Sequence, residues 1–263
     1  MSLLQKMFGK HQKRTHPYCA ALIAAAGSST RYGGENKLLQ TLDGIPVLVR
    51  TLLTIDRVEG IDEIVIAARE DELLPYAELC KTFGLRKPVK VIVGGATRTE
   101  SVLRAALEAS PETEFFAVQD GARPLVTNEV IAQAVSAAVS CGAAAPAVPV
   151  HDTIKRAESG LVLETPDRST LFAVKVVEGR IVKSTPDRAS LYAVQTPQVF
   201  DFDILRGALA KANADNAKLT DDCSAMEAAG RPVHLTPGDV ENLKITTPVD
   251  LRIAEAIWKG RTT

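Results

Sequence analysis

Two cations follow a loop of small residues near the start of the chain. Residues 22–39 read LIAAAGSSTRYGGENKLL, so a stretch of Ala, Gly, Ser and Thr leads to Arg31 and then to Lys37. Small side chains let backbone N–H groups approach a phosphate closely, and the hydroxyl groups add further donors. The pattern predicts a phosphate loop of a third kind, because neither the Walker pattern nor the dinucleotide-binding glycine pattern is present. The plainer alternative is a strand-to-helix turn with two solvated cations.

Two further positions carry charge that suits a bound triphosphate. Asp120 follows the apolar run 115–119. An Asp at the end of a strand can hold Mg²⁺, which needs only one or two protein carboxylates. Lys244, in the segment NLKIT, offers a third cation. The alternative for Asp120 is a turn residue that hydrogen-bonds to its own backbone.

A second glycine-containing segment, GGATRTES at 94–101, directly follows the apolar run 89–93. Glycines followed by Thr and Ser are typical of a capped helix start, which is the interpretation that spacing alone favours. The same place also suits contact with a nucleotide, because open α/β sheets bind ligands beyond the carboxyl ends of their strands.

Apolar runs alternate with segments of helical spacing through most of the chain. We predict strands at 20–25, 61–68, 89–93, 115–119, 143–148 and 233–236, and helices at 46–57, 71–84, 97–109, 127–141, 202–214, 221–229 and 248–259. Thr220 is expected to introduce the helix at 221–229. This alternation predicts right-handed crossovers and a doubly wound, mostly parallel α/β sheet.

The overall composition gives no general affinity for polyanions. The chain has 263 residues, with 31 Lys and Arg against 32 Asp and Glu, and a net charge of -1. We therefore expect no nucleic-acid partner and no stable membrane association. Any polyanion must be bound by a local cluster of cations. The four cysteines are widely spaced without a C-x-x-C pair, which indicates reduced thiols and a cytoplasmic location.

The predicted organisation is a basic flexible tail at 1–17 followed by one domain at 18–263. Within that domain, residues 150–195 depart from the strand–helix alternation. Residues 158–175 align with 178–195 at an offset of 20, half of the aligned positions are identical, and Thr-Pro-Asp-Arg occurs in both copies. We interpret this region as a β-arm with a 20-residue duplication, whose hairpin strands need a partner surface.

Taken in order, the motifs resemble those of the 2-C-methyl-D-erythritol 4-phosphate cytidylyltransferase family. They are AAAG-x-x-x-R, GG-x-x-R-x-x-S, DGARP, HDTIK, TPDR, QTPQ-x-F, TDD-x-SA-x-E and N-x-KIT-x-P-x-D, over about residues 18–259. The resemblance implies a Rossmann-like nucleotidyltransferase domain with a projecting β-arm that forms a homodimer, in the nonmevalonate isoprenoid pathway. It implies transfer of CMP from CTP to 2-C-methyl-D-erythritol 4-phosphate, which gives 4-diphosphocytidyl-2-C-methyl-D-erythritol and pyrophosphate.

The resemblance also assigns roles by position. Three cations would stabilise the pentacoordinate α-phosphorus: Arg31, Lys37 and Lys244. The nucleotide would be bound by Ala25, Ala26, Gly27, Gly95, Ser101 and Asp120, and Asp120 would also hold the metal. The polyol phosphate would be bound by Arg123, Thr153, Arg188 and Thr196, some of which the arm of a partner subunit would supply. A phosphate monoester is already a nucleophile at neutral pH, so no general base is expected.

Some positions depart from the family pattern. Ser29 stands where a second Gly is usual and Asn36 where Pro precedes the Lys, so we expect a less rigid loop, and Ala96 replaces an acidic residue seen in some members. The duplication offers both Arg168 and Arg188 as the substrate arginine, and we favour Arg188 because of its short link to Thr196. Two other functions stay open: a ribitol 5-phosphate cytidylyltransferase, and a nucleotide-binding scaffold without activity.

Overall fold

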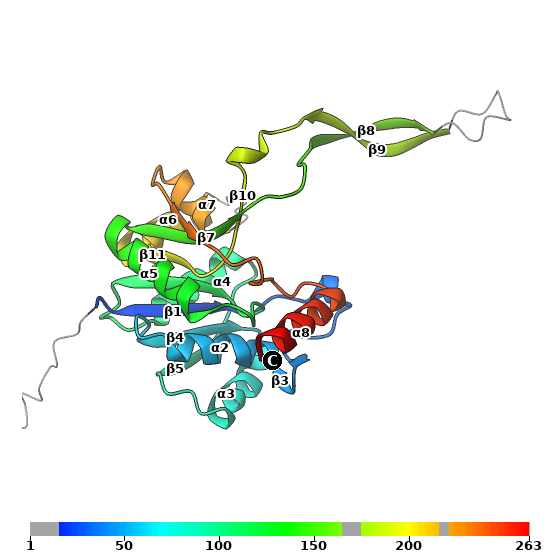
Figure 1. Ribbon diagram of the computed structural model, residues 1–263. Helices are drawn as coiled ribbons and strands as arrows, with labels where there is room; N and C mark the ends of the chain where they lie inside the picture. Colours follow the sequence, from blue (N-terminus) through cyan, green and yellow to red (C-terminus); the bar gives the residue numbers. More distant parts are fainter. Residues whose placement is uncertain (1–15, 165–174, 216–220, 263) are drawn as a thin grey trace, which may run out of the picture. The chain divides into compact units, whose positions relative to one another are not determined.

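In the computed structural model, the apolar run before the phosphate loop forms the interior strand β1 (Cys19–Ala24) of a mixed eight-stranded sheet (Figure 1). The structure describes residues 16–164, 175–215 and 221–262. They fall into two units: one comprises the residues up to 147 and from 194 onward, and the other comprises residues 148–193.

Most strands of the sheet run parallel to β1. The strand order is β10-β7-β11-β6-β1-β4-β5, with β12 paired to β7. β1 pairs in parallel with β4 and β6, β4 with β5, and β12 with β7, whereas β11 is antiparallel to β6 and β7. The bounds are β4 (Glu63–Ala68), β5 (Val89–Val93), β6 (Phe115–Asp120), β7 (Ala143–Pro149), β10 (Tyr192–Val194), β11 (Gln198–Asp201) and β12 (His234–Pro237). The predicted doubly wound, mostly parallel α/β sheet is confirmed.

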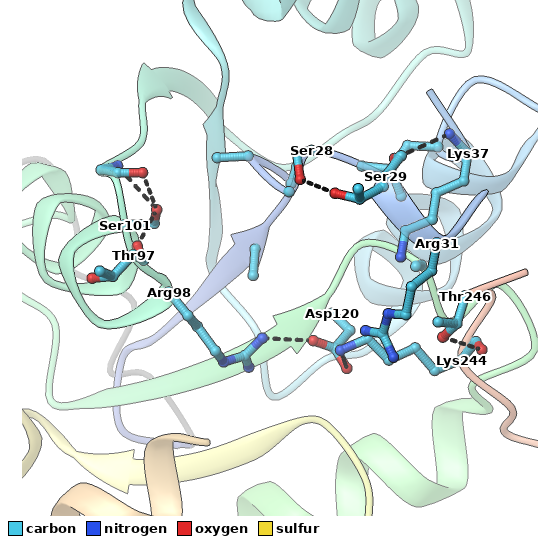
Figure 2. Close-up of a pocket in the computed structure, with 18 of the residues that line it drawn as sticks. Ser28, Ser29, Arg31, Lys37, Thr97, Arg98, Ser101, Asp120, Lys244 and Thr246 are labelled. Carbon is cyan, nitrogen blue, oxygen red and sulfur yellow. Dashed lines mark hydrogen bonds and ion pairs between the residues drawn. The ribbon is translucent and has the colours of Figure 1, made fainter. Parts of the chain in front are cut away.

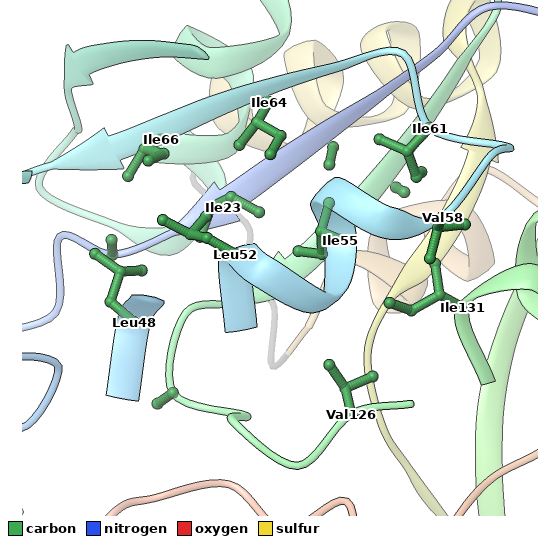
Figure 3. Packing of buried hydrophobic residues seen from close by; sticks show 14 of the residues in the cluster. Ile23, Leu48, Leu52, Ile55, Val58, Ile61, Ile64, Ile66, Val126 and Ile131 are labelled. Atoms are coloured by element: carbon green, nitrogen blue, oxygen red, sulfur yellow. The ribbon is translucent and has the colours of Figure 1, made fainter. Parts of the chain in front are cut away.

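Helices cover both faces of the sheet, which explains why its strands are apolar without alternation. Figure 1 shows α2 (Val47–Arg57) in front of the sheet and α4 (Arg98–Glu108) behind it. In β1, Ile23 packs into the core cluster that includes α2, and Leu22 packs into the cluster that includes α4. Figure 3 shows Ile23 against Leu48 and Leu52 of α2. The remaining helices are α3 (Leu73–Thr82), α5 (Asn128–Cys141), α6 (Phe202–Ala214), α7 (Asp222–Ala228) and α8 (Pro248–Thr262).

Short 3₁₀ turns and a two-stranded ribbon connect the longer elements. The 3₁₀ turns are η1 (Thr30–Tyr32), η2 (Glu70–Glu72) and η3 (Arg188–Ser190), and a two-stranded ribbon joins β2 (Thr41–Leu42) to β3 (Ile45–Pro46). The helix predicted at 71–84 is divided, because its first turn is η2 and the α-helix begins at Leu73. At α7 the capping residue is Asp221, whose side chain accepts a hydrogen bond from the Ser224 N–H, and Thr220, which was expected to introduce this helix, lies outside the described residues.

The second unit contains an antiparallel hairpin of β8 (Arg156–Glu164) and β9 (Lys175–Ser184). The opening segments of the two duplicated copies, 158–164 and 178–184, lie in β8 and β9 respectively. The hairpin strands expected in this region are therefore present. Residues 1–15 of the predicted tail, and Arg168 with the rest of the segment 165–174, lie outside the described residues. Among the residues described, no helix is long and apolar enough to cross a membrane.

Candidate active site

A cavity of about 470 Å³ lies beyond the carboxyl ends of the parallel strands. It forms there because β1 and β6 end at the same level, with Ala24 in register with Asp120. Its lining consists of residues 24–31 and 95–98 together with Lys37, Leu38, Ser101, Asp120, Ala122, Lys244 and Thr246. Nine residues predicted to bind nucleotide or to act in catalysis thus meet in one place: Ala25, Ala26, Gly27, Arg31, Lys37, Gly95, Ser101, Asp120 and Lys244.

The phosphate loop connects β1 to η1 with a left-handed residue at its tip. Ser29 has a φ of 52°, a conformation that favours glycine, and its carbonyl accepts a hydrogen bond from the Tyr32 N–H at 2.8 Å. This backbone explains why the family pattern has Gly here. The Ser29 hydroxyl in turn accepts a long hydrogen bond from the Lys37 N–H at 3.4 Å, so the side chain that replaces Gly connects the two ends of the loop.

The glycine pair before α4 allows close backbone packing. A Cβ on Gly94 would lie 2.7 Å from Cβ of Ala26, and one on Gly95 would lie 2.3 Å from the Glu100 side chain. Thr97 caps α4 by accepting from the Glu100 N–H, as expected for a capped helix start. The hydroxyl of the buried Ser101 accepts from the Gly95 N–H at 2.9 Å and donates to the Thr97 carbonyl at 2.8 Å. Ser101 therefore fixes the shape of this loop at the wall of the cavity.

Asp120 is the only carboxylate among the described residues that line the cavity. Its Oδ1 pairs with Arg98 at 2.7 Å, and its Oδ2 pairs with Lys244 at 3.0 Å and with Arg123 at 3.2 Å. Figure 2 shows Arg98 on one side of Asp120 and Arg31, Lys37 and Lys244 on the other. Burial alone would raise the pKa of Asp120, but Arg98, Lys244 and Arg123 lower it well below its usual range. Asp120 is thus a permanent anion held among cations.

Arg98 connects the cavity to α7. Besides its bond to Asp120, its Nη2 donates to Oδ2 of Asp222 at 2.8 Å, and its Nε donates to the same oxygen at 3.1 Å. Asp222 is 1% exposed and its backbone N–H is bound by the Gln198 side chain. Neither Arg98 nor Asp222 was predicted to be a functional residue, although both lie within motifs that resemble those of the family. Asp120 and Asp222 lie far apart in the sequence, so no local pattern could reveal that one arginine pairs with both. Only the fold shows this.

The cations around the cavity repel one another, and the charge of Asp120 opposes this repulsion. Burial lowers the pKa of Lys37, and the neighbouring Lys244 and Arg31 lower it further, against the opposing effects of Asp120 and Asp250. A chain whose net charge is only -1 therefore concentrates positive charge in one cavity. A bound polyphosphate would relieve this repulsion, so the electrostatics favour such a ligand.

Two of the predicted substrate residues, Arg123 and Thr196, form hydrogen bonds with Asp120. Arg123 is 9% exposed, and its Nη1 donates to the Asn242 carbonyl at 2.6 Å. Thr196 is 3% exposed, and its hydroxyl accepts from the Asp120 N–H at 3.1 Å. The segment that carries Lys244 is held nearby, because the Ile245 N–H donates to the Ala122 carbonyl at 2.8 Å. These hydrogen bonds hold Asp120 and the segment of Lys244 in position.

The other two predicted substrate residues belong to the unit at 148–193. Thr153 is exposed there, and Arg188, also exposed, donates from Nη1 to the His151 carbonyl at 2.7 Å. Their assignment to the substrate stays a prediction.

Asp120 is also the candidate for holding a divalent cation. The described residues contain no group of three His, Cys, Asp or Glu side chains that could hold a metal by themselves. Mg²⁺ often binds through one carboxylate and the phosphate oxygens of a nucleotide, and the donor set here fits that mode. Both oxygens of Asp120 are engaged by cations, so we expect the metal to enter together with a triphosphate rather than alone.

The lining of the cavity suits transfer of a phosphoryl-type group without a protein nucleophile. Its described residues supply cations, hydroxyl groups, backbone of small residues and one carboxylate, and none of them is His or Cys. Cations that face developing negative charge stabilise a transition state, and fixed positions reduce the entropic cost of reaching it. An ionised phosphate acceptor needs no general base.

A family model for 2-C-methyl-D-erythritol 4-phosphate cytidylyltransferase matches this chain over residues 19–179 and 173–260. The two matched segments overlap at residues that lie inside the duplicated arm. Together they cover both glycine-containing loops, Asp120 and Lys244.

Individual relatives agree with the family model. A 2-C-methyl-D-erythritol 4-phosphate cytidylyltransferase of Bacillus cereus is 38% identical over 236 residues, which is 89% of this chain and 95% of the relative. The crystal structure of a 4-diphosphocytidyl-2C-methyl-D-erythritol synthase from Anaerococcus prevotii superposes with a TM-score of 0.75 at 28% identity, covering 92% of this chain and 98% of that one. A cytidylyltransferase structure from Thermus thermophilus gives a TM-score of 0.66 at 29% identity, with coverage of 91% and 98%.

Proposed function

This chain belongs to the 2-C-methyl-D-erythritol 4-phosphate cytidylyltransferase family, and on that premise we propose that the cavity beyond β1 and β6 is its active site. The protein transfers CMP from CTP to 2-C-methyl-D-erythritol 4-phosphate and so serves isoprenoid synthesis. The observation that carries the assignment of the site is the cluster of Arg31, Lys37, Lys244 and Arg98 around the carboxylate of Asp120.

In the proposed mechanism, a phosphate oxygen of the polyol phosphate attacks the α-phosphorus of CTP and pyrophosphate leaves. One P–O bond forms and one breaks, and no proton must be removed from the nucleophile. Arg31, Lys37 and Lys244 stabilise the extra charge on the pentacoordinate phosphorus. The backbone of residues 25–27 and 95 binds the nucleotide, and Ser101 keeps the second loop in shape.

Arg123 and Thr196 act in this proposal through Asp120 and the segment that carries Lys244, as their burial and hydrogen bonds support. Asp120 would hold Mg²⁺, which when bound would neutralise part of the charge on the triphosphate. The arm residues Thr153 and Arg188 would bind the polyol phosphate, with the arm of a second subunit as their source.

We also propose a homodimer that works in the cytoplasm. A two-stranded hairpin is marginally stable by itself, and β8–β9 exposes apolar side chains, among them Ile181 at 44% and Val182 at 54%. A second copy of the arm would cover such side chains. The cytoplasmic location is supported by the cysteines, since all four are free thiols and three of them are buried.

The test of the proposed function is pyrophosphate release from CTP with two acceptors. We expect turnover with 2-C-methyl-D-erythritol 4-phosphate and little with ribitol 5-phosphate, which is a matched control because it is also a polyol phosphate. Faster turnover with ribitol 5-phosphate would reassign the substrate. If the protein binds CTP but releases no pyrophosphate with either acceptor, the nucleotide-binding scaffold would be favoured.

A further inference from the structure

The backbone that carries Lys37 is held from within its own loop. The Lys37 N–H donates to the Ser29 hydroxyl. The side-chain Oδ1 of Asn36 accepts from the Leu38 N–H at 2.9 Å, and its carbonyl accepts from the Leu39 N–H at 3.2 Å. Asn commonly forms such local turns by binding the backbone two residues ahead. Asn36 therefore closes a turn whose centre is Lys37.

The other end of the Asn36 side chain is tied to the start of α3. Its Nδ2 donates to the Tyr76 hydroxyl at 3.0 Å and also to Oε1 of Glu72. Tyr76 is 0% exposed and Glu72 is 5% exposed, and Arg69 binds the same Glu72 oxygen at 2.8 Å. An ionised carboxylate can only accept hydrogen bonds, so the amide NH₂ must face Glu72 and the amide oxygen must face Leu38. The turn is thus attached to a buried part of the fold.

This attachment matters because neighbouring cations repel the ammonium group of Lys37. Arg31 and Lys244 both lie close enough to act on its charge. In a loop held only by solvent-exposed bonds, the lysine would be freer to move away from these cations. A bond from the preceding residue to the buried side chains of Glu72 and Tyr76 resists that movement and keeps the ammonium group where the triphosphate arrives.

We propose that Asn36 is a positioning residue for Lys37, which it holds by tying the loop to Glu72 and Tyr76 of the α3 region. The inference rests on the proposed function, since it assigns Asn36 a part in the same transfer. In the family pattern a proline before the lysine restrains the backbone directly. In this chain the side chain of Asn36 supplies a restraint of another kind.

The experiment is a double-mutant cycle of Asn36→Ala with Lys37→Ala. We expect Asn36→Ala to lower kcat about 10-fold in the parent, with less change in the dissociation constant of CTP. In the Lys37→Ala background the same change should alter kcat less than about 2-fold, because its effect passes through the lysine. An equal loss in both backgrounds, or no loss in the parent, would overturn the proposal.

Gln40→Ala is the matched control, because Gln40 lies in the same loop and its side chain bonds only to Glu35 among the described contacts, at 3.3 Å. It should leave kcat unchanged. Thermal unfolding of each variant separates loss of positioning from loss of the fold. If Asn36→Ala does not fold, Tyr76→Phe takes its place in the cycle, since it removes one acceptor of Asn36 and keeps the buried ring.

Amide hydrogen exchange at Leu38 gives a readout that does not depend on activity. Tyr76→Phe leaves the direct partner of the Leu38 N–H intact, so faster exchange there would show that anchoring to α3 stabilises the turn. Unchanged exchange in both Tyr76→Phe and Asn36→Ala would overturn the proposal. A parent that releases no pyrophosphate would instead contradict the proposed function, while the exchange data would still decide the role of Asn36.

Discussion

At the scale of single residues, the chemistry depends on charges that are held in place before substrate arrives. Asp120 keeps Lys244, Arg98 and Arg123 near one another. Asn36 and Ser29 keep the turn around Lys37 in shape. None of these bonds requires a residue of unusual reactivity, and the catalytic effect arises from their arrangement.

Lys37 should give the enzyme an alkaline limit. Its pKa is lowered, first by burial and then by Lys244 and Arg31, so it loses its charge at a lower pH than an ordinary lysine with a pKa of about 10.4. We expect kcat/KM for CTP to fall as pH rises through this lowered value. Lys37→Arg should move the fall to higher pH, because a guanidinium stays protonated. The pH profile of Lys90→Arg, a lysine outside the cavity lining, serves as the control, and an unmoved limit in Lys37→Arg would exclude Lys37 as its cause.

Asp120→Asn should weaken metal binding to the CTP-loaded protein. The change removes the only carboxylate of the described cavity lining, so electron paramagnetic resonance should detect fewer bound Mn²⁺ ions, and a higher Mg²⁺ concentration should be needed for turnover. It also leaves the buried Arg123 without its anion, at a cost of roughly 3 kcal/mol in the free energy of unfolding. Asp222→Asn is the matched control, since it removes a charge from the same network outside the cavity lining. Equal Mn²⁺ binding by both variants would make Asp120 a structural residue only.

At the scale of elements, most strands and helices follow from apolar spacing, caps and glycines. The strand at 89–93 and the helix at 202–214 have the predicted bounds, because strong local signals mark both ends. The phosphate loop, Asp120 and Lys244 could be predicted as one site because each follows a strand or lies in a family motif. The links from Arg98 to Asp222 and from Asn36 to Glu72 could not, since no local pattern reports which distant polar side chains will meet.

Substitution of the two duplicated arginines, Arg168 and Arg188, tests which of them binds the substrate. Arg188 belongs to the copy that leads directly to Thr196, whereas Arg168 lies beyond the described residues. A guanidinium that binds a phosphate with two parallel bonds is poorly replaced by Lys. Arg188→Lys should therefore raise the KM for the polyol phosphate, and Arg168→Lys should leave it nearly unchanged. Steady-state kinetics of both variants decide the matter, with the reverse pattern assigning the substrate to the first copy.

At the scale of the whole molecule, the proposed dimer needs the apolar side chains of the arm. Replacing Ile181 and Val182 together by Ser should shift sedimentation equilibrium toward monomer, because the second copy would no longer bury them. Val249 and Ile253 of α8 are similarly exposed, at 50% and 48%, so their double Ser variant is the matched control and should remain dimeric. A parent that is monomeric at micromolar concentration would refute the dimer.

The central claim is that Arg31, Lys37 and Lys244 stabilise the transition state of CMP transfer more than they bind CTP. The measurement that tests it most directly compares kcat with the dissociation constant of CTP in the three Ala variants, with 2-C-methyl-D-erythritol 4-phosphate as acceptor. We predict that kcat falls by roughly 10²–10³ in each variant while the dissociation constant changes by much less. Unchanged kcat in all three, or a loss found entirely in CTP binding, would contradict the account.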